Sequence, residues 1–432
     1  MNKILGLFQL LCCAKDKTKI GFLTNYVDLS DIDKKNLLSI NDEHNYVDDF
    51  EKNIANEFGS GKVIAFASGR MGFYSILKAL SIGQGDEVAV TGFSCSVMVN
   101  AILRIGATPI FVDIDKDTLG TSPLDLEGKI TEKTKVVVAQ HTFGLPCRID
   151  KIAKVCKDHG IFLVEDCALT LCSSYKGVKL GDWGDATIFS TDHSKPLNSM
   201  IGGGVYTKDS IIYSRIKKIQ ETSGNLTHNQ VMSLVEMFIK EKNDLKKNKV
   251  ALLFAEYLRL FGYIIMKLFR IKNKRTFDLY NDFSSNVSQD SDYPYPARMP
   301  QKLAFLALRS LEDYKKNIQT RKEFANKTIA IVTEKELVPN IFFDLNADIV
   351  PLRVAYILKN KTKRDYSFLD TGWIWFQRPI VATSEDLKNF GYAAGSCPNS
   401  EEVGKSIMNI PIYYDLKKQN TILRYLSILY NN

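Results

Sequence analysis

The sequence predicts an α/β protein with a large domain built on a mostly parallel seven-stranded sheet and a smaller C-terminal α/β domain. Between residues 62 and 205, six short runs that are almost entirely apolar alternate with helical stretches. This alternation is typical of strands that crossover helices bury on both faces. A seventh strand opens at the triple glycine 202–204. With 432 residues, of which 45% are hydrophobic and 25% charged, the chain has the composition of a globular protein of two or three domains.

The six apolar runs predict strands at residues 63–66, 87–90, 109–112, 135–139, 161–164 and 186–189. Between them, apolar residues recur with helical periodicity, most clearly over 71–80, 96–105 and 149–159. The pattern stays helical from about 210 to 238. A turn-rich stretch with three prolines then covers 284–300, and a long helical run follows over 302–333. This run leads into a unit that contains Trp373, Trp375 and Phe376.

These shifts in pattern divide the chain into four parts. We predict an N-terminal segment, a large ligand-binding domain, an insertion with the turn-rich stretch, and a connecting helix with the small C-terminal domain, over residues 1–50, 51–239, 240–300 and 301–432. The short apolar run over 4–13 has no cleavage site after it, so we interpret it as a packed helix and not as a secretory signal.

Composition excludes several classes of protein. The eight cysteines contain no CxxC pair, which gives no support for a zinc ribbon or dithiol motif and favours a reducing compartment. We therefore expect no metal. The net charge of +8 is local, because residues 240–275 hold eleven Lys or Arg and three acidic residues. A nucleic-acid-binding protein spreads its positive charge over a folded face, so we expect no nucleic-acid partner. No apolar run is long enough to span a membrane, and we expect a cytoplasmic protein.

Residues 250–271 form an amphipathic pattern inside this basic segment. Polar residues fall on one narrow stripe, the other positions are almost all apolar, and lysines flank both ends. Such a helix suits peripheral contact with an anionic membrane surface, here the inner face. Burial against the body of the protein or across a dimer would give the same periodicity, so both interpretations stay open.

Polar side chains gather just after the predicted strands, where parallel sheets bind ligands. Ser68 and Gly69 begin a helix after the first strand, and a helix N-terminus suits a phosphate. Asp166 follows the fifth strand, while Ser190 and Lys195 follow the sixth. A phosphate seat, a buried carboxylate and a single lysine are what pyridoxal phosphate needs as its phosphate anchor, its pyridinium partner and its Schiff-base amine.

The segments SGRMGFYSILKAL, HTFGLPCRID, HGIFLVEDCA and YKGVKLGDWGDATIFSTDHSK, in this order and spacing, resemble the DegT/DnrJ/EryC1/StrS family of sugar aminotransferases. The resemblance implies a pyridoxal-phosphate enzyme of the aspartate-aminotransferase-like fold (fold type I) that works as a homodimer. It further implies transfer of an amino group from glutamate to a keto group of a nucleotide-linked deoxysugar, for polysaccharide or secondary-metabolite biosynthesis.

Matching positions carry the family's roles onto this chain. Lys195 would hold the cofactor covalently, with Asp166 on the pyridine nitrogen. Cofactor contacts are also implied for Ser68, Gly69 and Arg70 at the phosphate-binding helix, for Ser190 beside it, and for Cys95, Leu169 and His193. His141, in the HTFG segment, would lie near the cofactor or the substrate.

The chain departs from the family pattern at several of these positions. Cys95 stands where an aromatic ring usually stacks on the cofactor, and Leu169 stands where a glutamine is common. Arg70 replaces the usual threonine, and residues 296–299 read PARM where the family has NYRM. These departures keep open a non-catalytic or regulatory member of the fold. A sugar dehydratase is the other alternative, but that branch replaces the lysine with histidine, and Lys195 is present.

Overall fold

The computed structural model describes residues 37, 40, 44–246, 284–287, 293–359, 375–412 and 416–431. The predicted amphipathic helix at 250–271, the apolar run at 4–13 and Trp373 lie outside these residues. Within them, no helix combines the length and the apolar character that crossing a membrane requires.

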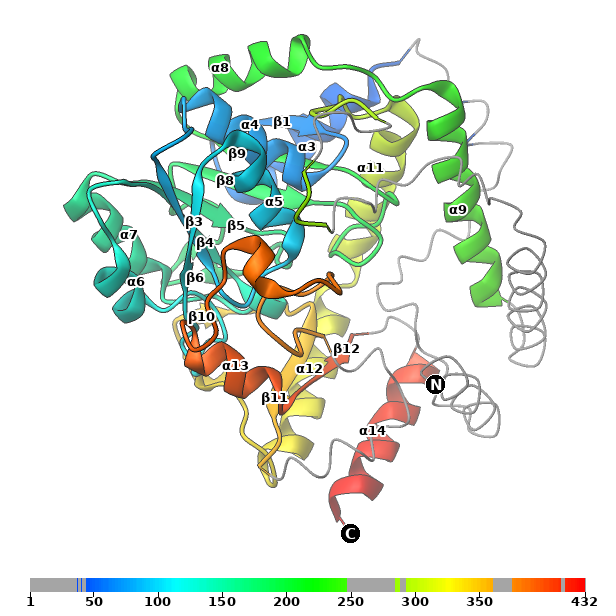
Figure 1. The fold of residues 1–432 in the computed structure, drawn as a ribbon. Helices are drawn as coiled ribbons and strands as arrows, with labels where there is room; N and C mark the ends of the chain where they lie inside the picture. The colour runs from blue at the N-terminus through cyan, green and yellow to red at the C-terminus, as the bar shows by residue number, and fades with distance from the viewer. Residues whose placement is uncertain are drawn as a thin grey trace, which may run out of the picture.

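A seven-stranded sheet forms the centre of the large domain (Figure 1). Its strands are β1 (Lys62–Phe66), β2 (Glu87–Thr91), β3 (Thr108–Val112), β4 (Thr134–Gln140), β5 (Phe162–Asp166), β8 (Ala186–Ser190) and β9 (Gly203–Thr207). They lie in the order β1-β9-β8-β5-β4-β2-β3, and β9 alone runs antiparallel to its neighbours β1 and β8. This arrangement confirms the mostly parallel seven-stranded sheet.

Helices enclose the sheet, as the buried pattern of its strands requires. They are α3 (Tyr46–Phe58), α4 (Gly69–Ala79), α5 (Ser96–Ile105), α6 (Pro123–Lys129), α7 (Ile149–His159), α8 (Ser210–Glu221) and α9 (His228–Lys246). In Figure 1, α6 and α7 lie to the left of the strands, and α3 lies to their right. The helices α5 and α7 end at Gly106 and Gly160, both in the left-handed conformation that glycine adopts without strain.

The long helix predicted over 302–333 is two helices. These are α11 (Gln301–Lys316) and α12 (Ile318–Thr333), which meet at Asn317. Asn317 leaves helical geometry at φ −106° and ψ 6°, and its Nδ2 donates a hydrogen bond to the Asp313 carbonyl at 2.8 Å. Asparagine competes for backbone partners in this way, so it ends a helix that periodicity alone would continue. The helical pattern over 210–238 is likewise interrupted, between α8 and α9.

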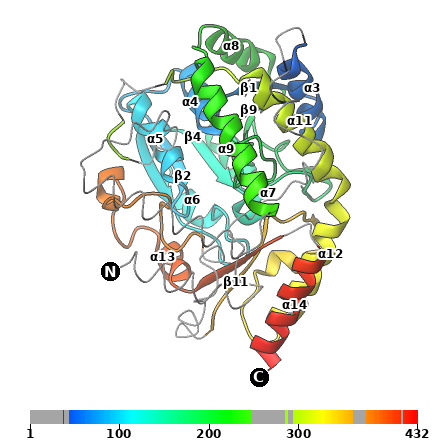
Figure 2. The ribbon, with the colours of Figure 1, turned by 90° about the vertical axis from the view of Figure 1, so that its right-hand side faces the viewer.

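A second hydrophobic core lies in the C-terminal part of the chain. It is formed by α12, the antiparallel pair β11 (Arg353–Ile357) and β12 (Ile407–Pro411), and α14 (Leu416–Asn431). In Figures 1 and 2, α12 and α14 lie side by side at the bottom of the molecule. The short strand β10 (Ala347–Asp348) instead pairs with β6 (Ser174–Tyr175), which forms a hairpin with β7 (Val178–Lys179).

The C-terminal part also contributes to the main core. Phe376, Ile380 and Phe390 are buried there, the last in the short helix η6 (Leu387–Phe390). The helix α13 (Pro398–Gly404) is fastened to the sheet through Asp113, which follows β3. The Asp113 carboxylate accepts hydrogen bonds of 2.8 Å from the backbone amides of Asn399 and Ser400. Chain segments nearly 300 residues apart therefore meet beside the ends of the strands.

Candidate active site

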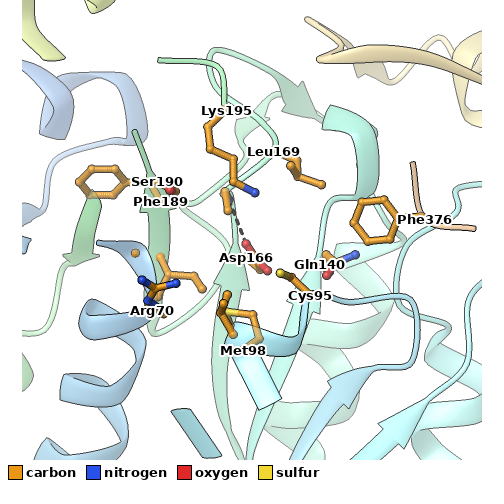
Figure 3. Close-up of a pocket in the computed structure, with 14 residues that line it drawn as sticks. Arg70, Cys95, Met98, Gln140, Asp166, Leu169, Phe189, Ser190, Lys195 and Phe376 are labelled. Atoms are coloured by element: carbon orange, nitrogen blue, oxygen red, sulfur yellow. Dashed lines mark hydrogen bonds between the residues drawn. The ribbon is translucent and has the colours of Figure 1, made fainter. Parts of the chain in front are cut away.

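A cavity opens at the carboxyl ends of the strands, where parallel sheets bind ligands (Figure 3). Seven of the predicted site residues line it: Gly69, Arg70, Cys95, Asp166, Leu169, Ser190 and Lys195. The structure thus brings together side chains from four separate loops of the sheet. Ser68 lies next to this lining, at the start of α4.

The N-terminus of α4 is prepared for a ligand. Ser68 is the N-cap residue, yet its side chain makes no capping hydrogen bond. Its Oγ is buried and has no hydrogen-bond partner among the described residues. A buried hydroxyl without a partner costs free energy unless a ligand satisfies it. Together with the unpaired amides and positive dipole end of the helix, this hydroxyl fits a phosphate group.

Two glycines let the first turn of α4 lie directly on the backbone of β8 and β9. A Cβ atom on Gly69 would come within 2.7 Å of the Phe189 carbonyl oxygen. Gly203 has φ of +149°, and a Cβ there would lie 2.3 Å from the same oxygen and 2.6 Å from the Gly69 nitrogen. Both contacts are closer than side-chain atoms allow. The position of the phosphate seat over the sheet therefore depends on glycine at 69 and 203.

Asp166 ends β5 and presents a buried carboxylate to the cavity, with only 5% of the residue exposed. Its Oδ1 accepts a hydrogen bond from the Ala168 amide at 2.9 Å, drawn as the dashed line in Figure 3. Oδ2 makes no hydrogen bond to any described residue. Burial raises the pKa of Asp166, and the hydrogen bond from Ala168 and the nearby Lys195 oppose that rise. A cation in the cavity would stabilise the ionised form further.

Lys195 reaches into the cavity from the loop that joins β8 to β9 (Figure 3). Its backbone amide donates to the Asp192 carbonyl at 2.9 Å, which fixes the start of the side chain. The Nζ atom lies 5.3 Å from the centre of the Trp375 ring. Asp166 and Lys195 act on each other electrostatically but are not a direct ion pair.

Cys95 lines the cavity at the N-terminus of α5, where a ligand finds fewer available amides than at α4. The Ser96 amide donates to the Val381 carbonyl and the Met98 amide to the Cys95 carbonyl, both at 3.0 Å. Burial raises the pKa of the Cys95 thiol. The raised pKa keeps the thiol protonated, so Cys95 is not an activated nucleophile.

The structure places His141 outside the cavity lining. Its Nδ1 accepts a hydrogen bond from the Cys147 amide at 3.2 Å, so in the neutral ring Nε2 carries the proton. Nε2 lies 3.1 Å from Oε2 of Glu165, a fully buried carboxylate. That carboxylate also accepts hydrogen bonds from the backbone amides of Gly181, Trp183 and Gly184. Glu165 faces away from Asp166, because neighbouring residues of a strand face opposite sides. His141 acts on Asp166 electrostatically, and its place near the cofactor or the substrate stays a prediction.

His141, Glu165 and Cys167 bring three potential metal-ligand atoms within 4.8 Å of one another. Burial raises the pKa of Cys167 to about 12, which keeps its thiol protonated. The proton on His141 Nε2 and the four donors on Glu165 leave no lone pair aimed at a common point. This cluster is a satisfied hydrogen-bond network and gives no reason to place a metal among its residues.

His193 also lies outside the cavity lining. Its side chain is 39% exposed, and its Nδ1 lies 3.4 Å from the Asp192 carboxylate. The backbone amide of His193 donates to the Met200 carbonyl at 3.2 Å. These contacts hold the loop that carries Lys195, and they give His193 no direct place in the cavity.

Gln140 and Phe376 line the cavity but were not among the predicted site residues. Gln140 is the last residue of β4 and pairs in register with Asp166, so both side chains face the same side of the sheet. The predicted strand ended one residue earlier, which hid this alternation. Phe376 comes from the C-terminal part of the chain and packs against Phe93 and Phe143 at ring distances of 5.2 Å. Its clustering with Trp373 and Trp375 was visible in the sequence, but its partner was not.

The fold is that of solved aminotransferase structures. DesI, crystallised in the presence of its TDP-sugar product, has a TM-score of 0.69 at 20% identity and covers 97% of this chain and 94% of its own. The aminotransferase from Psychrobacter cryohalolentis has a TM-score of 0.67 at 18% identity, with 90% and 92% covered. At these identities the likeness defines the fold class of the molecule.

Residues 31–239 match the DegT/DnrJ/EryC1/StrS aminotransferase family. The matched part of the chain contains all the strand-end residues of the cavity.

Curated relatives match a comparable length of the chain. GDP-perosamine synthase of Escherichia coli O157:H7 is 38% identical over 176 residues, which is 41% of this chain and 48% of the relative. The L-glutamine:2-deoxy-scyllo-inosose aminotransferase of Streptomyces fradiae is 38% identical over 186 residues, or 42% and 44%. The spore coat polysaccharide biosynthesis protein SpsC of Bacillus subtilis is 39% identical over 171 residues, or 40% and 44%. The chain thus spans about half the length of the curated relatives that it matches.

Proposed function

We propose that this protein is a pyridoxal-phosphate-dependent aminotransferase that moves an amino group from glutamate to a keto group of a nucleotide-linked sugar. One observation carries the proposal: Lys195 and Asp166 line a single cavity beside the uncapped N-terminus of α4. The named relatives support an amino-sugar product, since they include a perosamine synthase and a polysaccharide biosynthesis protein. We also propose that two copies of the chain form the active unit.

Each group of the cofactor has a matching residue. Ser68 and the first amides of α4 would hold the phosphate, with Arg70 and Ser190 beside it. Asp166 would hold the protonated pyridine nitrogen through Oδ2, and this cation would keep the carboxylate ionised. Lys195 would provide the amine for covalent attachment. When bound, pyridoxal phosphate supplies an electron sink for the charge left when a proton leaves the substrate carbon.

The residues of the chain move and shield that proton. Once its amine is free and unprotonated, Lys195 Nζ takes the proton from the carbon of one substrate and later returns one to the other. Gln140 is held by hydrogen bonds of its Nε2 to the Phe93 carbonyl and the Thr142 hydroxyl, so that side of the cavity is rigid. Phe376 and Leu169, both almost fully buried, exclude water from the same side.

The proposal is tested with purified protein and pyridoxal phosphate. We expect an absorbance band of lysine-bound cofactor that changes when glutamate is added and returns when a nucleotide-linked keto sugar follows. Lys195→Ala should abolish the band, whereas Lys157→Ala, on the exposed side of α7, should leave it intact. Glutamine is a second donor to include, because one relative is named for it.

Two outcomes would contradict the proposal. Absence of a Lys195-dependent band would remove the cofactor and with it the whole assignment. A band that does not respond to glutamate or to glutamine would instead favour the dehydratase or the regulatory alternative.

A further inference from the structure

The Lys195 amine lies over the indole ring of Trp375. Its Nζ lies 5.3 Å from the ring centre, and it makes no hydrogen bond or ion pair with a described residue. A lysine ammonium within about 6 Å of an indole face is attracted by the negative charge of the ring face. Trp375 is not part of the cavity lining, so the ring attracts the amine toward the side of the cavity.

Several contacts hold Trp375 in place. The Asn409 Nδ2 donates to the Trp375 carbonyl at 3.0 Å, and Asn409 is fully buried on β12. Phe376 packs against the indole at a ring distance of 5.2 Å, and Phe143 packs edge-on at 6.5 Å. The guanidinium of Arg353, on β11, lies 5.1 Å from the same ring. Trp375 is thus a fixed surface and not a side chain that follows the lysine.

The backbone on its C-terminal side is equally constrained. The Ile380 amide donates to the Gly92 carbonyl at 3.0 Å, and the Val381 amide donates to the Ser94 carbonyl at 2.8 Å. Phe376 and Ile380 have positive φ values of 59° and 45°, which non-glycine residues adopt only when their surroundings force them to. This strained segment fixes the height of Trp375 above the strand ends.

We propose that Trp375 is a positioning residue that holds the Lys195 ammonium beside the cavity before this lysine bonds to the cofactor. The inference rests on the proposed function, and it names a role that the cavity lining itself does not show. A fixed aromatic face next to the cavity holds the ammonium within reach of the site without a direct ion pair.

The contact competes with covalent attachment. Attachment requires the ammonium to lose a proton and the amine to add to the cofactor's aldehyde carbon, with one water leaving. The ring stabilises the ammonium and therefore the unattached state. Removing the ring should shift the equilibrium toward attachment by about three- to tenfold, the range expected for a partly desolvated cation on an indole.

The test is a series at one position: Trp375→Tyr, Trp375→Phe and Trp375→Leu, each titrated with pyridoxal phosphate. The readouts are the absorbance of lysine-bound cofactor and the mass added after borohydride reduction. We expect the attached fraction to increase in the order Trp, Tyr, Phe, Leu. The same substitutions in a Lys195→Ala background should leave noncovalent cofactor binding unchanged.

A merely structural tryptophan would give a different result. Attachment that weakens in Trp375→Leu, or that is equal in all four proteins, would overturn the inference while leaving the proposed function standing. Loss of noncovalent binding in the Lys195→Ala background would overturn it as well. If wild-type protein shows no Lys195-dependent attachment, the proposed function fails and this inference falls with it. The Tyr and Phe variants keep the test valid should Trp375→Leu fail to fold.

Discussion

Replacing Asp166 with asparagine should stabilise the cofactor-free protein and weaken the cofactor-bound one. The substitution keeps the shape of the side chain and removes its charge. The Asp166 carboxylate is 5% exposed and accepts one hydrogen bond from a described residue, from the Ala168 amide. Its surroundings therefore suit the neutral form better than the charged form, and burial raises the pKa of the carboxyl for the same reason.

The sign follows from linkage between protonation and folding. A carboxyl whose pKa is higher in the folded protein than in the unfolded chain binds protons preferentially when folded. The stability it contributes is complete below the unfolded pKa and is lost as the pH rises through the folded pKa. At neutral pH the charge is thus a cost to the cofactor-free fold. Asparagine removes this cost, on the order of 1 kcal/mol, which corresponds to about 1 °C in the melting temperature of a 432-residue chain.

When cofactor is bound, Asp166→Asn lowers the stability of the protein instead of raising it. A positive charge about 4 Å from the carboxylate contributes about 4 kcal/mol at the effective dielectric of protein sites, so its loss should weaken binding roughly 100- to 1,000-fold. At a cofactor concentration about 100 times the wild-type Kd, wild-type protein gains about 2.7 kcal/mol, whereas the variant gains less than about 0.5 kcal/mol. The order of the two melting temperatures should therefore invert on adding cofactor.

The assay is thermal unfolding at neutral pH, with and without pyridoxal phosphate, together with a spectroscopic titration. Asp158→Asn is the matched control, since Asp158 is exposed on α7 and pairs only with a lysine one turn away. Asp158→Asn should change neither the thermal unfolding curves nor the cofactor titration. A lower melting temperature of cofactor-free Asp166→Asn, or a cofactor-induced gain equal to that of wild type, would refute the reasoning.

Two further predictions concern the frame of the site. Gly203→Ala should destabilise the fold by about 2–4 kcal/mol and weaken cofactor binding at least tenfold, because its Cβ would lie 2.3 Å from the Phe189 carbonyl oxygen. Gly85→Ala is the control in urea unfolding, because Gly85 has φ of +94° but open space around it. An equal loss of unfolding free energy in both variants would contradict a role for the close approach. Asp113→Ala should lower the free energy of unfolding by about 3 kcal/mol in the same assay, because it leaves two backbone amides at the start of α13 unpaired. A loss under about 0.5 kcal/mol would refute this role of Asp113.

Much of the sheet and several site residues follow from local sequence. A run such as 135–139 has no polar residue to face water after its first position, so it has to be a strand buried on both faces. Gly69 follows a strand and opens a helix, and that pattern alone predicts an anion seat. Asp166 and Lys195 could be named because each directly follows an apolar strand or its short loop.

Other features were missed where a single residue decides which way a side chain points or where a helix ends. In the structure β4 extends one residue further than predicted, to Gln140, whose side chain faces the cavity beside Asp166. His141 comes next and contacts Glu165 on the other side of the strand. Side chains of a strand alternate between its two faces, so a predicted end one residue too early leaves the direction of the next side chain undetermined. The break at Asn317 was missed for a similar reason, because a single side-chain hydrogen bond to Asp313 outweighs an otherwise helical pattern.

By itself, the sequence determined the order of strands and helices and which side chains lie at the strand ends, because these depend on neighbours a few residues away. Tertiary structure alone decided what closes the cavity. Trp375 stands 180 positions after Lys195, and the two meet only because the segment around Ile380 bonds to the backbone after β2. Local periodicity carries no information about such a pairing, since it results from the packing of the C-terminal part against the sheet.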